Sequence, residues 1–332
     1  MAVSRIPATM RAAVIDVFGP PDVITLQQLP VPTIGPHEIL IEVHAAGVGI
    51  WDAEERQGAY ASGDERFPIV LGLDGAGVVA DVGAAQERFK KGQRAWAYDF
   101  DKPKGGFYAE YVAVSADSAG HVPTELDLLH AGAAAVTGLT ALQGIDDHLH
   151  VRHRETVLIF GASGAVGTLA VQFAKLRKAT VIGTASTKGG QALVRQLGAD
   201  HAFDARADNS QERLRSFAPK GIDAVLALAG GDDLERCIDV VKDGGRVAYP
   251  NGIDPEPQPR SNLELIGYDA VSRPEEFARL GHAVEESSLQ VPIAAEFKLE
   301  QAVEAHERVE RGRPAGRIVL RIREQKADES TG

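Results

Sequence analysis

The chain has 332 residues, of which 44% are hydrophobic and 25% are charged, and its formal net charge is −12. This length favours two domains, and the acidic balance argues against nucleic acid or an anionic membrane as the main partner. The single cysteine, Cys237, excludes an internal disulfide. The N-terminal segment lacks the apolar stretch of a signal peptide, and no run of about 18 apolar residues indicates a membrane span. We therefore expect a cytoplasmic protein.

Residues 1–125 are predicted to form a compact β-rich domain. Short apolar or alternating runs, rich in glycine and proline, indicate strands at residues 10–17, 23–29, 39–46, 70–82, 92–97 and 105–114. Many short strands separated by turn residues are typical of a barrel-like all-β domain.

Residues 126–288 have a different character, because strands and helices alternate there. Strands of the buried type are predicted at residues 156–160, 180–184, 202–204, 224–228 and 245–249, with a possible sixth at 263–268. This alternation predicts a doubly wound parallel sheet, so the fold class is α/β. The amphipathic helix and the strand within residues 289–325 belong more naturally to the first domain, as its closing part. Residues 326–332 are polar and are expected to be a disordered tail.

The central motif lies between residues 156 and 188. A strand of sequence TVLIF is followed by GASGAVG and then by apolar residues at helical spacing. Glycines in such a turn can have a purely steric role, but a strand before them and a helix after them favour dinucleotide binding. A diphosphate would sit on the backbone N–H groups of residues 163–166. The whole candidate turn consists of Gly161, Ala162, Ser163, Gly164, Ala165, Val166 and Gly167.

The end of the second strand in this motif favours NADP(H) over NAD(H). A dinucleotide fold that prefers NAD has Asp or Glu there to bind the ribose, whereas this chain has Ser186, Thr187 and Lys188. Two hydroxyls and an ammonium group suit a 2′-phosphate, with Arg206 as a further contributor. The alternative interpretation is a solvated loop. Further cofactor-binding candidates follow the fourth and fifth strands, at the strand ends where dinucleotides bind: Ala229, Gly230, Asn251 and Gly252.

The whole pattern resembles the medium-chain dehydrogenases/reductases, and within them the zinc-independent quinone oxidoreductase (zeta-crystallin-like) family. The motifs that carry the resemblance are MRAAVIDVFGPPD, AAGVGIWDAEERQGAY, PIVLGLDGAGVVADVG, GGFYAEYV, AAAVTGLTAL, VLIFGASGAVG and GRPAGRIVL. The resemblance implies a GroES-like catalytic domain beside a Rossmann NADP(H)-binding domain. It also implies a small-molecule quinone or activated carbonyl as substrate, and a homodimer formed through the edge strands of the cofactor domains.

The resemblance also points to individual site residues. Asp52, Arg56 and Tyr60 match one motif of the family, so Asp52 and Tyr60 are candidate catalytic residues. Trp51 and Tyr60 are candidate walls of the substrate cleft, although plain packing is an equally good explanation for an aromatic side chain. Thr137 resembles the threonine that the family places near the nicotinamide.

Departures from the pattern of the superfamily bear on the chemistry. Zinc-dependent members carry a cysteine within AAGVGIWD, a His-Glu pair where this chain has Leu73 and Asp74, and four cysteines near residues 95–110. With one cysteine neither zinc site can be formed, so we expect no metal. Many quinone oxidoreductases have Asn where this chain has Gly49, which puts in doubt one polar contact to the substrate or the nicotinamide.

Two other patterns have plainer explanations. His148, His150 and His153 do not share a helical face, which favours a solvated loop over a metal site. Tyr98 and Lys102 match the YxxxK pair of short-chain dehydrogenases, but they precede the dinucleotide fold instead of following it, so we reject that role.

Three functions are compatible with the sequence. The favoured one is NADPH-dependent, zinc-independent transfer of hydride to a quinone, for which no strong general acid is needed because the nicotinamide carries the chemistry. The second is NADPH-dependent reduction of a carbon–carbon double bond in an enone or enal. The third is an NADPH-binding sensor or structural protein with little turnover, which Gly49 keeps open.

Overall fold

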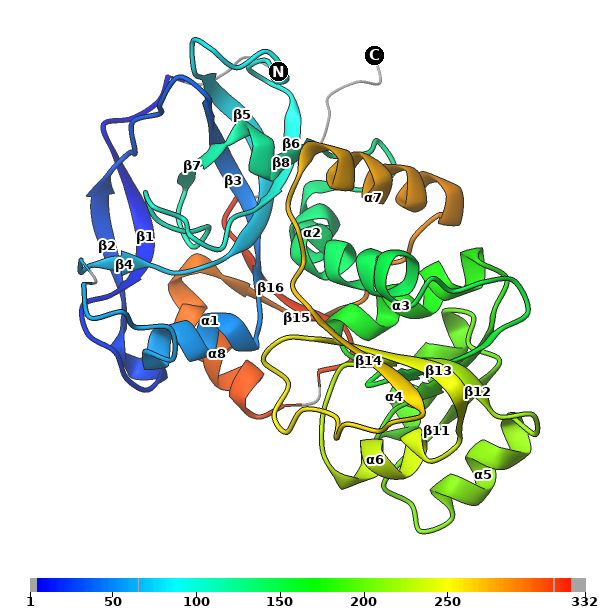
Figure 1. Cartoon of the computed structure of the whole chain (residues 1–332). Coiled ribbons are helices and arrows are strands. Elements are labelled where there is room, and N and C mark those ends of the chain that lie inside the picture. Colours follow the sequence, from blue (N-terminus) through cyan, green and yellow to red (C-terminus); the bar gives the residue numbers. More distant parts are fainter. Residues whose placement is uncertain (1–4, 65, 313, 324–332) are drawn as a thin grey trace.

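The computed structural model describes residues 5–64, 66–312 and 314–323 and arranges them around two large sheets (Figure 1). The predicted tail at residues 326–332 lies outside these described residues. One sheet is built from the first third of the chain and from its closing strands. The other is built from the middle of the chain, as the alternation of strands and helices predicted.

The first large sheet has the strand order β15-β16-β3-β5-β6-β8, and β7 also pairs with β3. Its strands are β3 (Glu38–Val48), β5 (Asp74–Val82), β6 (Arg94–Tyr98), β7 (Tyr111–Ser115), β8 (Ala119–His121), β15 (Ile293–Lys298) and β16 (Arg317–Arg321). A smaller sheet joins β2 (Ile24–Pro30), β1 (Thr9–Ile15) and β4 (Ile69–Val70). This β-rich region has the GroES-like architecture that the resemblance implied.

Strand β3 shows how the sequence forms this region. Its side chains alternate between two faces, as in any strand. Ile39, Ile41 and Val43 pack into one buried cluster with Phe107, whereas Leu40 packs into a second cluster on the other face. Strand β3 ends just before helix α1 (Ile50–Gln57), and α1 contacts helix α8 (Ala302–Glu310) from the end of the chain.

The second large sheet is the Rossmann sheet, six parallel strands in the order β11-β10-β9-β12-β13-β14. Its strands are β9 (Thr156–Phe160), β10 (Thr180–Thr184), β11 (His201–Phe203), β12 (Ile222–Ala227), β13 (Val241–Pro250) and β14 (Leu263–Tyr268). The doubly wound parallel sheet is therefore confirmed, including the sixth strand. Strand β13 begins four residues before the predicted start at residue 245. Residues 241–244 are of mixed polarity, so they do not show the apolar pattern of a buried strand.

Helices cover both faces of the Rossmann sheet. Val157 and Ile159 of β9 pack into a cluster with α2 (Leu128–Gln143) and α3 (Ala165–Leu176). Leu158 and Phe160 pack on the other face with α5 (Ser210–Phe217) and α6 (Asp232–Ile238). A strand buried on both faces is continuously apolar, which explains the sequence TVLIF.

Helix α2 lies between the two sheets, because it contacts β3 and β5 on one side and α3 on the other. Gly132 shows how close this packing is, since a Cβ there would lie 2.6 Å from the carbonyl oxygen of Ala45. The stretch Leu128–His148 is long and apolar enough to span a membrane, but 83% of its most apolar window is buried inside the protein. The apolarity of this helix is therefore explained by its place in the core.

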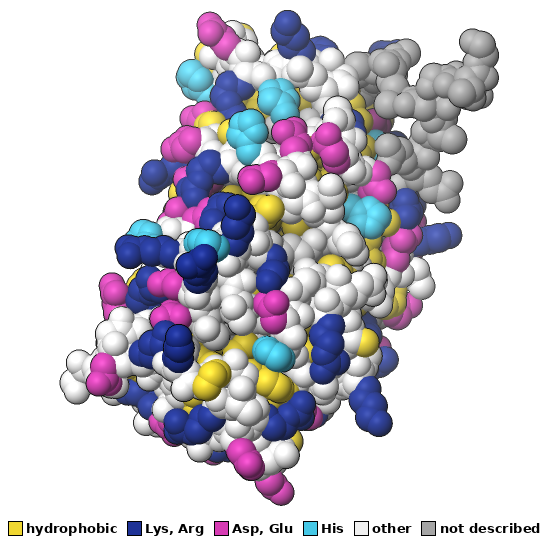
Figure 2. All heavy atoms as spheres, turned by 90° about the vertical axis from the view of Figure 1, so that its right-hand side faces the viewer, with side chains coloured by type: hydrophobic (Ala, Val, Ile, Leu, Met, Phe, Trp, Pro, Cys, Tyr) yellow, Lys and Arg dark blue, Asp and Glu magenta, His cyan; other side chains and the backbone are white. Residues whose placement is uncertain are grey.

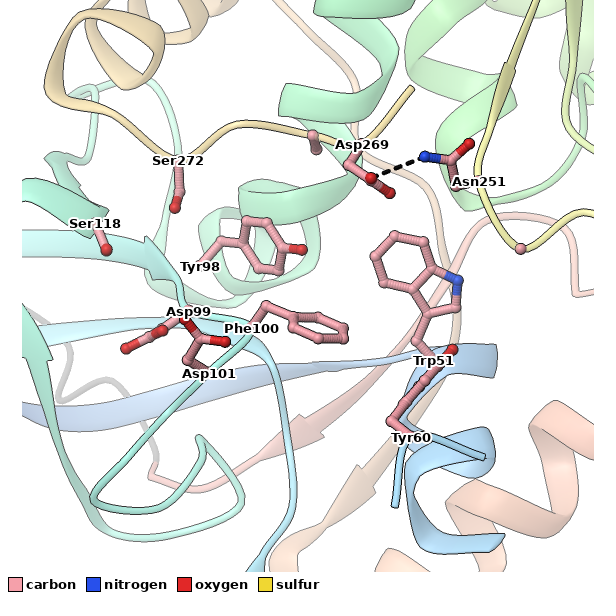
Figure 3. Close-up of a pocket in the computed structure, with 12 residues that line it drawn as sticks. Trp51, Tyr60, Tyr98, Asp99, Phe100, Asp101, Ser118, Asn251, Asp269 and Ser272 are labelled. Atoms are coloured by element: carbon pink, nitrogen blue, oxygen red, sulfur yellow. Dashed lines mark hydrogen bonds between the residues drawn. The ribbon is translucent and has the colours of Figure 1, made fainter. Parts of the chain in front are cut away.

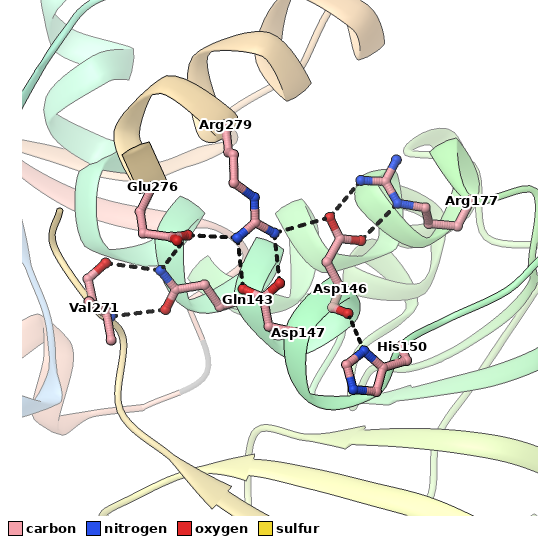
Figure 4. Close-up of polar contacts among 8 residues, drawn as sticks. All are labelled: Gln143, Asp146, Asp147, His150, Arg177, Val271, Glu276 and Arg279. Carbon is pink, nitrogen blue, oxygen red and sulfur yellow. Dashed lines mark hydrogen bonds and ion pairs between the residues drawn. The ribbon is translucent and has the colours of Figure 1, made fainter. Parts of the chain in front are cut away.

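A polar cluster fixes the end of α2 to its neighbours (Figure 4). Arg177 donates two hydrogen bonds to Asp146, at 2.8 and 2.6 Å. Arg279, on α7 (Pro274–Ser287), donates to both carboxylate oxygens of Asp147. The side chain of Gln143 donates to the carbonyl of Val271 and accepts from its N–H, both at 2.9 Å. These bonds hold the connection between β14 and α7 in place.

Two of the three histidines of the predicted loop, His148 and His150, make different contacts. His148 stacks on Tyr268 with ring centroids 4.3 Å apart, and Nδ1 of His150 lies 2.9 Å from the carbonyl oxygen of Asp146. Among the described residues, no group of three or more potential metal-binding side chains is found. Figure 2 shows that basic and acidic side chains are interspersed over the face of the molecule that it presents.

Candidate cofactor and substrate site

The glycine turn begins where β9 leaves the sheet. Gly161 has φ +85°, a conformation that glycine adopts readily. Its N–H donates to Oγ1 of Thr184 at 2.8 Å, and the N–H of Ala162 donates to the carbonyl of Thr184 at 3.0 Å. A Cβ on Gly167 would lie 2.3 Å from the carbonyl oxygen of Gly161. The turn therefore needs glycine at both of these positions, and β10 holds it in place.

The predicted diphosphate donors are only partly free. The N–H of Gly164 donates to the carbonyl of Gly161 at 3.0 Å, so this donor is already used. Ala165, Val166 and Gly167 form the first turn of α3, where backbone N–H groups have no carbonyl partner within the helix. The carbonyl of Ser163 accepts from the N–H of Gly316 at 2.9 Å. The turn is thus in contact with the segment that leads into β16.

The predicted 2′-phosphate residues come together at the end of β10. Helix α4 (Lys188–Gln196), which the sequence did not predict, begins here, because Oγ1 of Thr187 caps it by accepting from Gly190 N–H at 3.0 Å. Arg206 reaches the same place and donates to the carbonyl of Ser186 at 2.7 Å. Its guanidinium is also bound by both carboxylate oxygens of Asp204, which raises the pKa of Arg206. Lys188 is exposed in the first turn of α4.

The remaining predicted cofactor-binding residues differ in their exposure and in their contacts within the protein. Asn251 donates from its side-chain amide to Asp269 at 2.8 Å, directly after β13. A Cβ on Gly230 would lie 1.9 Å from the carbonyl oxygen of Pro255, so this glycine allows two loops to touch. Ala229 lies beside it and is exposed. The hydroxyl of Thr137 donates to the carbonyl of Ala133 at 2.8 Å within α2 and is buried.

A cavity of about 500 Å³ lies where the two sheet regions meet (Figure 3). From the first region it is lined by Trp51, Tyr60 and the four residues from Tyr98 to Asp101. From the Rossmann side it is lined by Asn251, Gly252, Asp269 and Ser272. Two of the predicted cofactor residues and both predicted cleft aromatics are therefore brought together around one hollow.

Phe100 is the centre of the aromatic wall. It makes edge-to-face contacts with Trp51 at 6.2 Å and with Tyr60 at 5.6 Å between ring centroids. The hydroxyl of Tyr60 donates to Glu54, and burial together with Glu54 raises the pKa of Tyr60. Burial and the nearby Asp74 raise the pKa of Tyr98, which lines the cavity and is 5% exposed. Both phenols therefore keep their protons at neutral pH.

A buried ionic cluster lies next to the N-terminus of α1. Asp52 is 2% exposed and accepts from the N–H groups of Gly49 at 2.7 Å and Leu73 at 3.2 Å. Asp74 is fully buried and accepts from Arg317 at 2.7 Å. Burial, with the repulsion of Asp74, raises the pKa of Asp52 to about 7, although Arg317 acts in the opposite direction. The guanidinium of Arg317 is bonded to Asp74, so it offsets the burial of Asp52 only in part.

Asp52 and Tyr60 were the predicted catalytic residues. Tyr60 lines the cavity, whereas Asp52 is not part of its wall. Whether either acts in catalysis stays a prediction. The sequence did not identify Phe100, Asp99, Asp269 or the Arg317–Asp74 pair, because each becomes a site residue only through contacts between distant segments. The only local signal was the aromatic and acidic run from Tyr98 to Asp101.

A GroES-like β-rich region joined to a Rossmann sheet, with a glycine turn facing the junction, defines the class of medium-chain dehydrogenases/reductases. Comparison with known proteins agrees. The family model described as "Alcohol dehydrogenase GroES-like domain" matches residues 35–124, and the model described as "Zinc-binding dehydrogenase" matches residues 197–320. The quinone oxidoreductase of Pongo abelii is 33% identical over 324 residues, which cover 94% of this chain and 97% of the relative.

Solved structures give the same class. An NAD-dependent alcohol dehydrogenase has a TM-score of 0.86 at 31% identity, with 95% of this chain and 100% of the other covered. A mycobacterial protein in complex with NADPH has a TM-score of 0.83 at 26% identity, with 94% and 100% covered. The chain therefore belongs to the zinc-independent quinone oxidoreductase family of medium-chain dehydrogenases/reductases, and it is an oxidoreductase.

The described residues at the expected zinc position offer too few donors for a zinc site, although one matching family model is described as "Zinc-binding dehydrogenase". Leu73, at the position of a zinc-binding histidine, is a buried apolar side chain. Asp74 beside it is bound to Arg317 and to the N–H of Val136. A tetrahedral zinc site needs three or four Cys, His or carboxylate ligands in one place. The residues present do not fit a zinc ion.

Proposed function

We propose that this chain is an NADPH-dependent reductase that transfers hydride to a quinone without zinc. The observation that carries the proposal is the cavity of about 500 Å³ between the two sheet regions, with its wall of aromatic side chains. Flat aromatic ligands pack well against such rings. Membership of the quinone oxidoreductase family supports the same reaction class.

We propose NADP(H) as the cofactor on the chemistry of the donors at the end of β10. Lys188 is an exposed ammonium in the first turn of α4, and the hydroxyl-bearing Ser186 precedes it. The guanidinium of Arg206 is already shared with Asp204, so Lys188 makes the larger contribution. The mycobacterial relative bound to NADPH supports this choice, and the NAD-dependent relative is the reason to test both cofactors.

The residues of the chain bind, orient and exclude water, while a bound nicotinamide would supply the hydride. Trp51 and Phe100 offer ring faces and edges against which an acceptor can lie. Among the described residues, the hydroxyl of Tyr98 has no hydrogen-bond partner, and Tyr98 lines the cavity. We propose that this hydroxyl donates a hydrogen bond to the oxyanion that develops on the acceptor. Solvent then supplies the proton.

The decisive experiment is NADPH and NADH oxidation with phenanthrenequinone, benzoquinone and an alkenal as acceptors. Fast loss of NADPH with quinones, and little with the alkenal, is the expected result. Turnover with the alkenal alone would replace the proposal with enone or enal reduction. Tight NADPH binding without turnover with any acceptor would replace it with a sensor or structural role.

We also propose that the chain forms a homodimer through β14. This strand is the last in the order of the Rossmann sheet, so it pairs with β13 on one side and leaves its other edge open within the described residues. An open strand edge is a template for pairing with a second chain. The molar mass in solution, measured by light scattering, tests this assembly.

A further inference from the structure

The wall of the cavity carries charge of a single sign. Three of its lining residues are carboxylic acids: Asp99 and Asp101, which follow β6, and Asp269, which follows β14. No Lys, Arg or His is among the described residues that line it. Figure 3 shows Asp99 and Asp101 beside Phe100, and Asp269 across the hollow next to Asn251. The acidic groups therefore come from both sides of the cavity.

The charge of these carboxylates is not neutralised by an ion pair. Asp99 accepts from the backbone N–H of Lys102 at 3.1 Å, and Asp269 accepts from the side-chain amide of Asn251 at 2.8 Å. Both donors are neutral, so they fix the carboxylates without cancelling their charge. Within the described part of the chain, none of the three acids forms an ion pair.

Two buried basic side chains near these acids or near the ionic cluster of Asp74 are committed to other carboxylates. The ammonium of Lys102 pairs with Glu55 and is 8% exposed. The guanidinium of Arg317 pairs with Asp74 in the buried cluster. Neither residue lines the cavity. A ligand in the cavity therefore meets three carboxylates, and no basic side chain among the described lining residues opposes them.

The aromatic wall acts in the same direction. The face of an aromatic ring carries the negative end of its quadrupole and attracts cations. Trp51, Tyr60, Tyr98 and Phe100 all line the cavity. Rings and carboxylates together favour flat ligands that are neutral or positive, and both disfavour negative ones.

We propose that this cavity selects its acceptor by charge: it accepts neutral and cationic aromatic quinones and discriminates against sulfonated or carboxylated ones. The inference rests on the proposed function, because it assumes that the acceptor binds in this cavity. It names a property of the substrate that family membership does not give, since it depends on Asp99, Asp101 and Asp269 of this chain.

The test compares three acceptors that share one ring system: naphthoquinone, its sulfonate, and a derivative with a quaternary ammonium side chain. Substituents change the intrinsic reactivity of a quinone. We therefore compare the sulfonate-to-ammonium ratio of kcat/KM in each variant with the same ratio in wild type. For the double variant Asp99→Asn/Asp101→Asn, we expect the sulfonate-to-ammonium ratio of kcat/KM to rise about tenfold. Asp269→Asn should shift it in the same direction by a smaller factor.

A matched control removes one negative charge far from the cavity. Glu212 is exposed on α5, and Figure 1 shows α5 on the side of the Rossmann region that faces away from the first sheet. Glu212→Gln should leave the ratio unchanged. The effect of the cavity variants should also shrink as salt is added, because salt screens exposed charges. A ratio that stays within twofold of wild type in the cavity variants would overturn the inference.

A binding measurement separates this inference from the proposed function. The chain has two tryptophans: Trp51 lines the cavity, whereas Trp96 is 0% exposed. Quenching of tryptophan fluorescence by each quinone therefore reports occupancy of the cavity without turnover. Quenching without reduction would count against quinone reduction, while the ratio of the binding constants would still decide the charge selectivity. Reduction of all three acceptors with equal binding would retain the function and refute the selectivity.

Discussion

The buried carboxyl group of Asp52 gives the sharpest test of the structure, through the variant Asp52→Asn. Asp52 is 2% exposed, and the nearby guanidinium of Arg317 is bonded to Asp74 instead. Asparagine has almost the same shape and cannot ionise. The carboxyl group of Asp52 accepts hydrogen bonds from the N–H groups of Gly49 and Leu73. The side chain of asparagine has one carbonyl oxygen, so it can accept from only one of them. At low pH the variant should therefore be less stable than wild type, by about 1–3 kcal/mol.

The balance should reverse as the pH rises. Burial raises the pKa of Asp52 from 3.8 to about 7 in the folded protein. Between about pH 4 and pH 7 the unfolded chain loses this proton and the folded chain keeps it, so wild-type stability falls as the pH rises. A difference of about three pKa units corresponds to a loss on the order of 4 kcal/mol. The variant has no such loss and should be the more stable protein above neutrality.

The assay is urea unfolding of both proteins between about pH 4 and pH 8, with the midpoint and slope converted to free energies. The control is Asp22→Asn, which changes an exposed aspartate near β2. The control should follow wild type at every pH. If the curves of Asp52→Asn and wild type are parallel, the folded protein already holds Asp52 ionised and the reasoning is refuted.

Three further predictions concern the cofactor, the oxyanion and a buried histidine. Tyr98→Phe should lower kcat with quinones by about tenfold or more, because it removes the proposed oxyanion donor, whereas Tyr60→Phe should have a smaller effect because its hydroxyl is donated to Glu54. Equal losses in steady-state kinetics would contradict this assignment. Lys188→Ala should weaken NADPH binding much more than NADH binding in fluorescence titrations, and equal weakening would remove Lys188 from the 2′-phosphate site. Burial lowers the pKa of His306 to about 3, so wild-type stability is lost as the pH falls below about 6.5. His306→Leu should move the midpoint of acid unfolding to lower pH, and an unchanged midpoint would show that His306 is not buried in its neutral form.

The βαβ unit was predictable because its signals are local. The β-branched and apolar run from Thr156 to Phe160 predicts a buried strand. The glycines at 161 and 167 mark a turn whose geometry excludes a side chain. Helix α4, which begins at Lys188, was not predicted, for the opposite reason. Two glycines follow Lys188 and weaken the helical pattern, while the cap from Thr187 is a single hydrogen bond.

The substrate cavity could not be predicted in the same way, because its two sides are far apart in the chain. Phe100 and Asp269 line the same cavity, although the sequence around either residue gives no indication that the other lies close to it. The connection that bears Asp269 is held by the contact between Gln143 and Val271, residues 128 positions apart. Long-range contacts of this kind depend on how helix α2 packs between the two sheets, and a local pattern carries no information about that packing.

Gly49 shows how one such contact changes the meaning of a sequence difference. Many family members have Asn at this position. Its replacement by glycine is the reason why the sequence left open a third function, an NADPH-binding protein with little turnover. In this chain a Cβ on Gly49 would lie 2.8 Å from Nη1 of Arg317, and a Cβ on Gly47 would lie 2.3 Å from Nη2. Both glycines therefore make room for the guanidinium that pairs with Asp74. The packing of Arg317 therefore gives a structural reason for glycine at position 49.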